Sequence, residues 1–259
     1  MRVATTVLRT DLAVAALDGQ VEDRGDHVAV RTVDQPDFYW GNYLAISPTD
    51  DAAAAVAWLE RAAEIGRPGG HAALALDGVI DAAVAAALVA AGATVETLIA
   101  MTSDAPVLAP APPGLALRPL DRDADWDALL ALSLTIDPDT PALRRFLTRR
   151  IAARARAAAR GDVRWWGAFA GPTLVASAGM VPLPGLGRFQ DVQTHPAWRR
   201  RGAASAVLAA LADEQRRAGR TRLVLVVAED NPPARAAYRR LGFVDGDRAT
   251  TALRAPAQT

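Results

Sequence analysis

The hexapeptide RRRGAA, residues 199–204, joins a predicted strand to a predicted helix. Residues 189–194 alternate as a short strand does, and Pro196 ends them. After Gly202 the apolar residues recur every three or four positions, which predicts an amphipathic helix. Glycine permits a tight turn, and the unpaired N–H groups at a helix start attract anions. The hexapeptide therefore predicts a phosphate-binding turn.

This turn differs from two common phosphate-binding loops. A Walker loop needs a glycine-rich run that ends in Gly-Lys-Ser/Thr, and the chain contains no lysine. The dinucleotide fingerprint needs three spaced glycines, which are missing here.

A second motif follows the first helix. Residues 221–228 form a β-branched, apolar run of strand length. Asn231 is placed to cap the next helix, with Pro232 at its first position. That helix is expected to end at Gly242, after which residues 243–244 are extended.

The two motifs together resemble the GNAT superfamily of acyl-coenzyme A-dependent acyltransferases. Arg199-x-x-Gly202-x-Ala204 matches the family's pyrophosphate loop, and the run from Asn231 through Tyr238 to Gly242-Phe243 matches the helix and strand that close the coenzyme site. The resemblance covers residues 113–259. It implies an α/β (α+β) fold, with a mixed and mostly antiparallel sheet flanked by helices.

The other elements of that fold have candidates in the sequence. Strands are expected at residues 115–120, 165–170 and 174–181, and helices at residues 121–136 and 141–160. The last helix carries seven arginines. In the resembled fold this region partly covers the acceptor site, so the arginines could attract an acidic acceptor, but we interpret them as a solvated face because the apolar residues of the helix already explain a surface helix. Trp165 and Trp166 are expected to pack against it.

The resemblance also implies a set of residues for acetyl-CoA, the expected co-substrate. Backbone N–H groups of the turn and nearby arginines would hold the pyrophosphate. The implied coenzyme-binding residues are Val192, Gln193, Thr194, Arg199, Arg200, Arg201, Gly202, Ala203, Ala204, Asn231, Ala234 and Tyr238.

Acyl transfer needs an acid and a way to remove a proton from the amine. The resemblance places Tyr238 as the acid that protonates the leaving thiolate. Asp191, Gln190 and Glu229 are alternatives on the acceptor side, where Asp191 and Glu229 can accept a proton and Gln190 can only position the amine or a water. Strand alternation turns only one of Gln190 and Asp191 towards the substrate, and a bulge would change which one. A water chain without a dedicated base is a further alternative.

Composition limits the possible classes of function. The formal net charge is +0, which disfavours nucleic acid and anionic membranes as partners. With 0 cysteines there is no disulfide and no thiolate metal site, and the 3 histidines show no metal-ligand spacing. No signal peptide or membrane-spanning stretch is evident, so a soluble cytoplasmic protein without a metal is expected.

The chain is predicted to contain two domains. Residues 105–113 form a Pro/Ala linker, with an N-terminal domain at residues 1–104 and a catalytic domain at residues 114–259. The first domain repeats the order of the second, with strands at residues 39–46, 71–76 and 94–101 and helices at residues 48–66 and 79–91. This repetition indicates an internal duplication.

The N-terminal copy lacks the chemistry of the second. Asp50 and Asp51 stand where the basic turn should be, and carboxylates there suit capping but repel phosphate. Leu88 aligns with Tyr238 and has no proton to give. We therefore expect a degenerate GNAT-like domain without a coenzyme site. Its aromatic cluster at residues 38–43 is interpreted as a core strand.

The sequence favours an N-acyltransferase over a non-catalytic acyl-CoA-binding or regulatory module, because Asn231 and Tyr238 accompany an intact turn. A small-molecule amine or a protein N-terminus is the expected acceptor. A monomer or a homodimer is expected.

Overall fold

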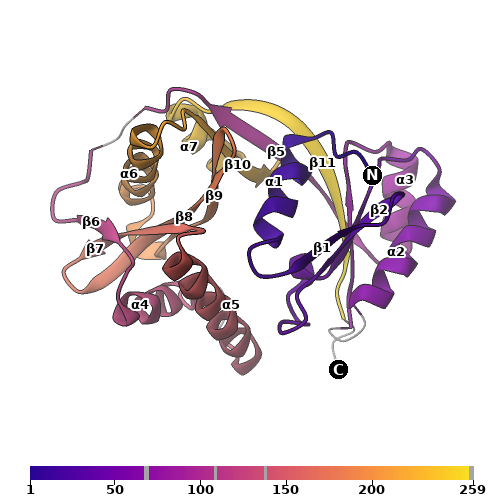
Figure 1. Cartoon of the computed structure of the whole chain (residues 1–259), viewed down its shortest axis with the longest axis horizontal. Coiled ribbons are helices and arrows are strands. Elements are labelled where there is room, and N and C mark those ends of the chain that lie inside the picture. The colour runs from indigo at the N-terminus through magenta and orange to yellow at the C-terminus, as the bar shows by residue number, and fades with distance from the viewer. Residues whose placement is uncertain (67–69, 108–109, 137–138, 257–259) are drawn as a thin grey trace. The chain divides into compact units, whose positions relative to one another are not determined.

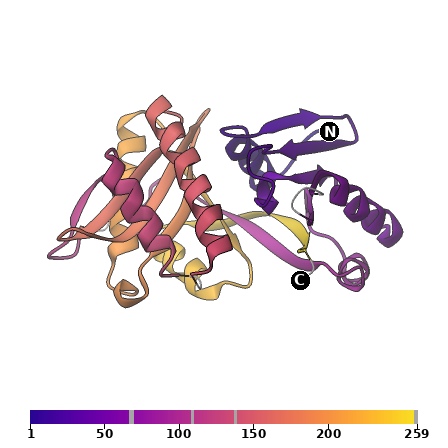
Figure 2. The ribbon, with the colours of Figure 1, turned by 90° about the horizontal axis from the view of Figure 1, so that it is seen from below.

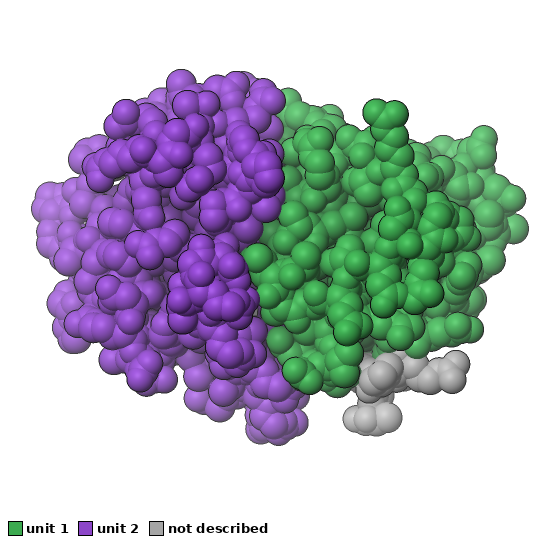
Figure 3. Space-filling view, viewed as in Figure 1, with its two compact units in different colours: residues 1–100, 226–235, 245–259 green, residues 101–225, 236–244 purple. Residues whose placement is uncertain are grey.

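The computed structural model describes residues 1–66, 70–107, 110–136 and 139–256. They form two compact units, which Figure 3 colours separately. The first unit comprises Met1–Ala100, Val226–Arg235 and Asp245–Thr259, and the second comprises Met101–Leu225 and Ala236–Val244. Both are built on mixed, mostly antiparallel strands flanked by helices, which confirms the predicted fold class.

The strand order in the first unit is β1-β2-β3-β4-β11-β5. The β3–β4 pair is parallel, and the β1–β2, β2–β3 and β4–β11 pairs are antiparallel. The strands are β1 (Gln20–Asp23), β2 (His27–Arg31), β3 (Tyr43–Ile46), β4 (Ala72–Leu76), β5 (Thr94–Ser103) and β11 (Val244–Arg254). The sequence did not predict β1 or β2, and β1 lacks an alternating pattern because all four of its residues are exposed.

Helices cover both faces of these strands in the first unit. The helices α2 (Ala52–Gly66) and α3 (Ala82–Ala90) pack with Leu44 and Ile46, and α1 (Thr6–Ala15), which was not predicted, packs with Tyr43 and Ala45. Successive residues of β3 thus point to opposite faces, as the strand period of two requires. Figure 1 shows α1 apart from α2 and α3.

The predicted strand at residues 39–46 is only half correct. Its first part is a 3₁₀ turn, η1 (Tyr39–Gly41), and the strand begins at Tyr43. Asn42 is the physical reason. Its buried side-chain amide donates to the carbonyls of Gln35 and Phe38, both at 2.9 Å, and its Oδ1 accepts from the Thr32 N–H. These bonds hold the aromatic residues in a turn.

The strand order in the second unit is β10-β9-β8-β7-β6. The β9–β10 pair is parallel and the other pairs are antiparallel. The strands are β6 (Ala116–Pro119), β7 (Arg164–Ala170), β8 (Thr173–Leu183), β9 (Leu186–Thr194) and β10 (Arg222–Ala228).

The helices α4 (Asp123–Ser133) and α5 (Pro141–Arg160) cover one face of the second unit's strands, and α6 (Ala203–Arg217) covers the other (Figures 1 and 2). The bounds of α5 are those predicted. Trp165 faces α4, where its ring centroid lies 6.3 Å from that of Trp126. Trp166 instead donates to Glu214 of α6 at 2.8 Å, so its predicted packing against α5 is wrong. Adjacent strand residues point to opposite faces.

The two compact units do not have the same bounds as the two domains predicted on either side of a linker at residues 105–113. Residues 108–109 of that linker lie outside the described part of the chain. Strand β11 belongs to the first unit, because Thr250–Arg254 pair antiparallel with Leu76–Ala72 of β4. Asp247 of β11 also accepts hydrogen bonds from the N–H groups of Thr6 and Val7, at 2.8 and 3.2 Å, at the start of α1. The first unit is therefore completed by the last strand of the chain.

The order strand, helix, parallel strand, helix, strand occurs twice in the chain. It runs through β3, α2, β4, α3 and β5, and again through β9, α6, β10, α7 (Pro232–Arg240) and β11. The helix ends match in detail. Gly92 and Gly242 have φ of 86° and 83°, and the next N–H bonds the carbonyl of Leu88 in one case and Tyr238 in the other, both at 3.1 Å. The backbone thus supports the alignment of Leu88 with Tyr238.

The buried carboxylate of Asp125 in α4 stabilises the second unit. It accepts two hydrogen bonds of 2.7 Å from the Arg118 guanidinium and two from the Arg122 guanidinium, at 3.0 and 3.2 Å. The Arg118 guanidinium, above all, holds the Asp125 pKa well below its ordinary value. This pKa is lower in the folded protein than in the unfolded chain. The stabilisation is therefore complete above about pH 4 and decreases as the pH falls below that value.

We predict that Asp125→Asn lowers the free energy of unfolding at pH 7 by about 2 kcal/mol. The difference from the unmodified protein should shrink at pH 3, as measured by urea unfolding at both values. Asp123→Asn, at an exposed residue of the same helix turn, is the control and should change stability little. Equal losses in both variants would show that the Asp125 ion pairs contribute nothing specific.

Candidate functional site

The basic turn lies between β9 and α6 of the second unit. A 3₁₀ turn, η3 (Pro196–Trp198), follows β9, and Gly202 then forms the N-cap of α6 with φ of 82°. Glycine adopts this left-handed conformation without strain. Among the described residues, none accepts a hydrogen bond from the N–H groups of Ala203, Ala204 or Ser205. The helix start therefore presents free donors to an anion.

Three arginines surround these donors. Arg199, Arg200 and Arg201 are exposed, and no carboxylate of the described chain pairs with any of them. The Arg201 guanidinium carbon lies 5.3 Å from the Trp198 ring centroid. We call residues 199–204 the cradle. Its unpaired positive charges and free N–H groups suit a pyrophosphate.

The helix start of the N-terminal copy is capped instead. Asp51 Oδ1 accepts hydrogen bonds from the N–H groups of Ala53 and Ala54, at 2.8 and 3.1 Å, at the start of α2. The predicted capping role of Asp51 is thus confirmed. A carboxylate at this point occupies the donors that a phosphate would need.

Helix α7 has the predicted local structure. Asn231 Oδ1 accepts from the Ala234 N–H at 3.2 Å, which confirms Asn231 as the N-cap. Arg235 of the same helix donates to the Glu229 carbonyl and to the Asp245 carboxylate, at 2.8 and 2.7 Å. These bonds fix the first turn of the helix within the first unit.

Tyr238 lies on the part of α7 that belongs to the second unit. Its ring centroid is 6.3 Å from that of Phe243, which in turn lies 6.0 Å from the ring of Phe189 in β9. Burial raises the pKa of the Tyr238 phenol, and the positive charge of Arg188 partly opposes that shift. Arg188 is itself buried, and its Nη1 donates to the Phe189 carbonyl at 2.6 Å. No sequence pattern marked Arg188.

Strand β9 has a bulge at Asp191. The register passes from Ser177–Gln193 to Gly179–Gln190, so β9 contains one more residue than β8 at this point. Asp191 has φ of 45°, and its carboxylate pairs with Arg154 of α5. The bulge anticipated for this strand is thus present.

The interpretation of the α5 arginines as a solvated face is wrong for Arg154. Only 12% of its side chain is exposed. Its guanidinium carbon lies 5.1 Å from the Trp165 ring centroid. Arg154 is three positions from both Ile151 and Ala157, which are buried. This helical spacing was the signal in the sequence that Arg154 lies on the buried face.

The remaining candidates on β9 and β10 have their own contacts. Gln193 Oε1 accepts from Ser133 of α4 at 2.9 Å, and Glu229 pairs with Arg248 at 2.8 Å within the first unit. The β9–β10 pairing ends at Arg188 and Val224. In the part of the chain that the structure describes, the rest of β9 pairs only with β8, where Thr194 stands opposite Ala176 and Val192 lies at the bulge. One backbone edge of β9 is therefore available to a ligand.

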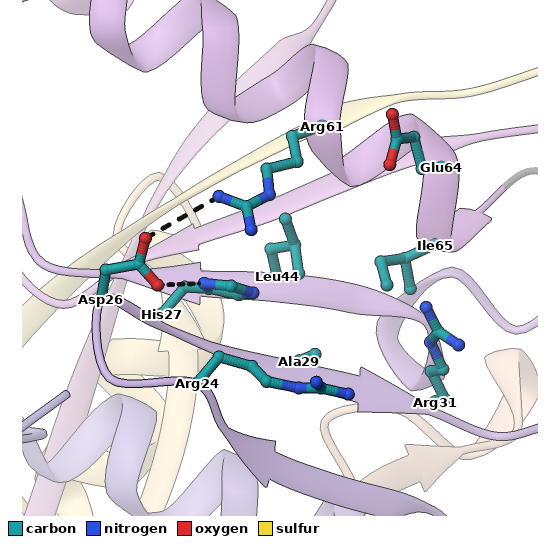
Figure 4. A pocket seen from close by; sticks show the side chains of 9 residues that line it. All are labelled: Arg24, Asp26, His27, Ala29, Arg31, Leu44, Arg61, Glu64 and Ile65. Carbon is teal, nitrogen blue, oxygen red and sulfur yellow. Dashed lines mark hydrogen bonds and ion pairs between the residues drawn. The ribbon is translucent and has the colours of Figure 1, made fainter.

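The first unit has a groove of its own, with a volume of 420 Å³ (Figure 4). Its most buried charged or titratable side chain is His27, whose Nδ1 lies 2.6 Å from Asp26 Oδ1, and Arg61 lies 3.8 Å from the other oxygen of Asp26. His27 and Arg61 also contact the Trp58 ring, at 5.1 and 4.7 Å. The Asp26 charge is thus paired within the groove.

The described residues, 1–66, 70–107, 110–136 and 139–256, offer neither a metal site of clustered side chains nor a membrane-spanning helix. No group of three or more His, Cys, Asp or Glu side chains in these ranges is arranged to hold a metal ion. No helix among them combines the length and the apolar character needed to cross a bilayer.

Solved structures share this fold. A functionally unknown conserved protein from Staphylococcus epidermidis superposes with a TM-score of 0.74 at 13% identity, over 93% of this chain and 96% of that one. A GCN5-related N-acetyltransferase from Kribbella flavida superposes with a TM-score of 0.65 at 18% identity, over 100% of this chain and 97% of that one. A tandem GNAT protein from the clavulanic acid biosynthesis pathway superposes with a TM-score of 0.54 at 18% identity, over 78% of this chain and 70% of that one.

No curated protein matches the sequence. Residues 126–243 match the model of the acetyltransferase (GNAT) family, and this segment contains the cradle, strand β9 and Tyr238. The matched segment thus agrees with the two sequence motifs, which resembled the same family.

Proposed function

We propose that this protein is an N-acyltransferase that moves an acyl group, acetyl in the first instance, from acyl-CoA to an amine. The observation that carries the proposal is the cradle, where uncapped N–H groups of α6 meet three arginines without carboxylate partners. A diphosphate is the chemical group that this arrangement fits best. The free edge of β9 supports binding of the rest of the coenzyme.

The reaction follows from the needs of direct transfer. Acyl-CoA supplies an activated thioester. The amine nitrogen forms a bond to the carbonyl carbon, the carbon–sulfur bond breaks, and the amine proton passes to a base or to water. Tyr238 then donates its proton to the leaving thiolate. Burial raises the pKa of Tyr238, so the phenol keeps this proton at neutral pH.

The amine proton has several possible acceptors. Asp191 is held at the β9 bulge by its pair with Arg154, and Glu229 pairs with Arg248. Gln190 follows the strand register opposite Gly179 and carries no basic group. We propose Asp191 as the residue that receives or orients the amine, with bulk water as the final acceptor of the proton.

The N-terminal half is proposed to be a degenerate copy that binds no coenzyme. It keeps the order of elements but has a capped helix start at Asp51. It also has the fully buried Leu88 in place of the acid. Its role in this proposal is structural, because its strand β4 pairs with β11.

A non-catalytic acyl-CoA-binding module is the second candidate function. The observation in its favour is that Asp191 and Glu229, the two carboxylate candidates for the base, both form ion pairs. Such a module would bind acyl-CoA but would release no free CoA with any amine.

Calorimetric titration of the full chain with acetyl-CoA and with CoA tests the proposal. Saturable one-to-one binding is expected, followed by release of free thiol when an amine panel is added. Absence of binding would reject both candidate functions, whereas binding without thiol release across the panel would favour the module.

We predict that Tyr238→Phe keeps the acetyl-CoA affinity and lowers turnover by about 100-fold, because only the proton donor is lost. Binding is measured by calorimetry and turnover by thiol release. Tyr43→Phe, which removes a buried hydroxyl in the first unit, is the control and should leave turnover unchanged. Full activity of the Tyr238 variant would remove Tyr238 as the acid.

A further inference from the structure

Four buried nitrogen atoms of the second unit have no hydrogen-bond partner among the described residues. They are Nε and Nη1 of Arg154, Nε2 of Gln190 and Nε1 of Trp165. All four belong to groups that only donate hydrogen bonds. A buried donor without an acceptor costs about 1–3 kcal/mol, so several in one place mark a site that lacks its acceptor.

The three side chains are neighbours. The Arg154 guanidinium carbon lies 5.1 Å from the Trp165 ring centroid, and Arg154 also pairs with Asp191, which adjoins Gln190. Trp165 stands opposite Gly179 in the β7–β8 register, and Gly179 stands opposite Gln190 in the β8–β9 register. Residues directly opposite on adjacent strands point to the same face. Arg154, Trp165 and Gln190 therefore form one donor cluster beneath α5.

Gly179, in the middle of this row, leaves room for the Trp165 ring. A Cβ atom there would lie 2.5 Å from Cζ3 of Trp165, so the indole ring lies across the glycine, between β7 and β9. The ring can occupy this position only because residue 179 has no side chain. Its N–H group is thereby held on the same face as the Gln190 amide.

Resting on the proposed acyl transfer, we propose that the donor cluster binds the carboxylate of the acceptor, and that the acceptor is an α-amino acid. A carboxylate offers acceptor sites only, and it matches the planar fork of a guanidinium. A neutral carbonyl offers fewer acceptor sites and no charge.

The charge around the donor cluster favours an anion. Helix α5 carries seven arginines and no acidic residue. Arg145 and Arg156 of this helix have no carboxylate partner in the described ranges. The positive potential of α5 attracts a carboxylate towards Arg154.

The carboxylate of Asp191, beside Arg154, favours a ligand that carries a positive charge as well as a negative one. Its carboxylate touches the Arg154 guanidinium and is 39% exposed. The site thus presents a negative and a positive group side by side. An α-amino acid carries an ammonium and a carboxylate at the same close spacing, so the first meets Asp191 while the second meets Arg154. This arrangement places the amine at the residue proposed to receive it.

The test compares α-amino acids with their carboxamides, which keep the amine and lose the carboxylate. The full chain is saturated with acetyl-CoA, and thiol release gives KM and kcat for each acceptor. We expect transfer to at least one amino acid, with a KM for the matching amide at least about 10-fold higher. Equal KM values for acid and amide would overturn the proposal and leave acyl transfer intact.

Variants of the donor cluster provide the second arm. Arg154→Gln should raise the KM of the amino acid at least about 10-fold more than the KM of the amide, because only the amino acid has a carboxylate that loses its partner. Gln190→Glu, which replaces a donor by a carboxylate, should have the same effect. Arg156→Gln removes an equal charge from an exposed position of α5 and is the control.

Three results would contradict the inference. If Arg154→Gln raises both KM values equally, Arg154 is structural. If acetyl-CoA binds but no amino acid is acetylated, the acceptor class is wrong. If the unmodified protein does not bind acetyl-CoA in calorimetry, the proposed function itself fails, and the inference fails with it.

Discussion

Replacing Gly202 with glutamate is expected to abolish acetyl-CoA binding, with a loss of affinity of at least about 100-fold. Gly202 has φ of 82°, where a residue with a Cβ atom is strained. A Cβ there would also lie 3.4 Å from Cγ of Pro112. The larger effect is electrostatic, because the new carboxylate stands among Arg199, Arg200 and Arg201 and competes with the diphosphate for them.

The matched control is Gly219→Glu. Gly219 has φ of 76°, and no heavy atom lies within 4 Å of its ideal Cβ position. This variant has the same charge and similar backbone strain at the opposite end of α6. Calorimetry should find normal affinity in Gly219→Glu and none in Gly202→Glu, while circular dichroism shows that both are folded. Normal affinity in both variants would refute the cradle as the coenzyme site.

The second large effect is expected at Ala252 in β11. Ala252 is fully buried in the core between the first unit's strands and the helices α2 and α3. Ala252→Glu should lower the free energy of unfolding by about 4 kcal/mol, because an unpaired carboxylate cannot be accommodated there. The melting temperature should fall by about 10 °C.

The strands that lose hydrogen-exchange protection distinguish a local effect on the β4–β11 pair from general destabilisation. Hydrogen exchange should show loss of protection in β4, because β4 and β11 pair directly. Val244→Glu adds the same charge to the same strand at a residue that is 63% exposed, and it should change neither measurement. Protection lost only in the second unit would contradict the pairing described for β11.

Local signals explain what the sequence could predict. The bounds of α5 follow from Thr140, which caps the helix start, and from Gly161, which ends the helix with φ of 83°. The cap at Asn231 and the turn at Gly202 likewise depend on residues within a few positions. These features, together with the spacing between them, were sufficient for the family and the fold class.

Contacts between residues far apart in the sequence explain the features that the sequence could not predict. The partner of β11 is set by β4, some 170 or more residues away, so no local pattern could show it. The burial of Arg154 in helix α5 depends on Trp165 of strand β7, and an arginine row on a helix usually faces solvent. Asn42 turned an apparent strand into a bend through bonds to Gln35 and Phe38. Tertiary context overrode the local pattern in each case.

The pairing of β4 with β11 has a consequence for synthesis of the chain. Residues 1–100 leave the ribosome long before β11 does. At about 5–20 residues per second, the intervening chain of about 150 residues takes roughly 8–30 s to make. Throughout that interval β4 has an open edge, to which the strand of another nascent chain can bind. Residues 1–100 are therefore made well before the unit that contains them can be complete, and chaperones that shield strand edges are expected to matter most for it.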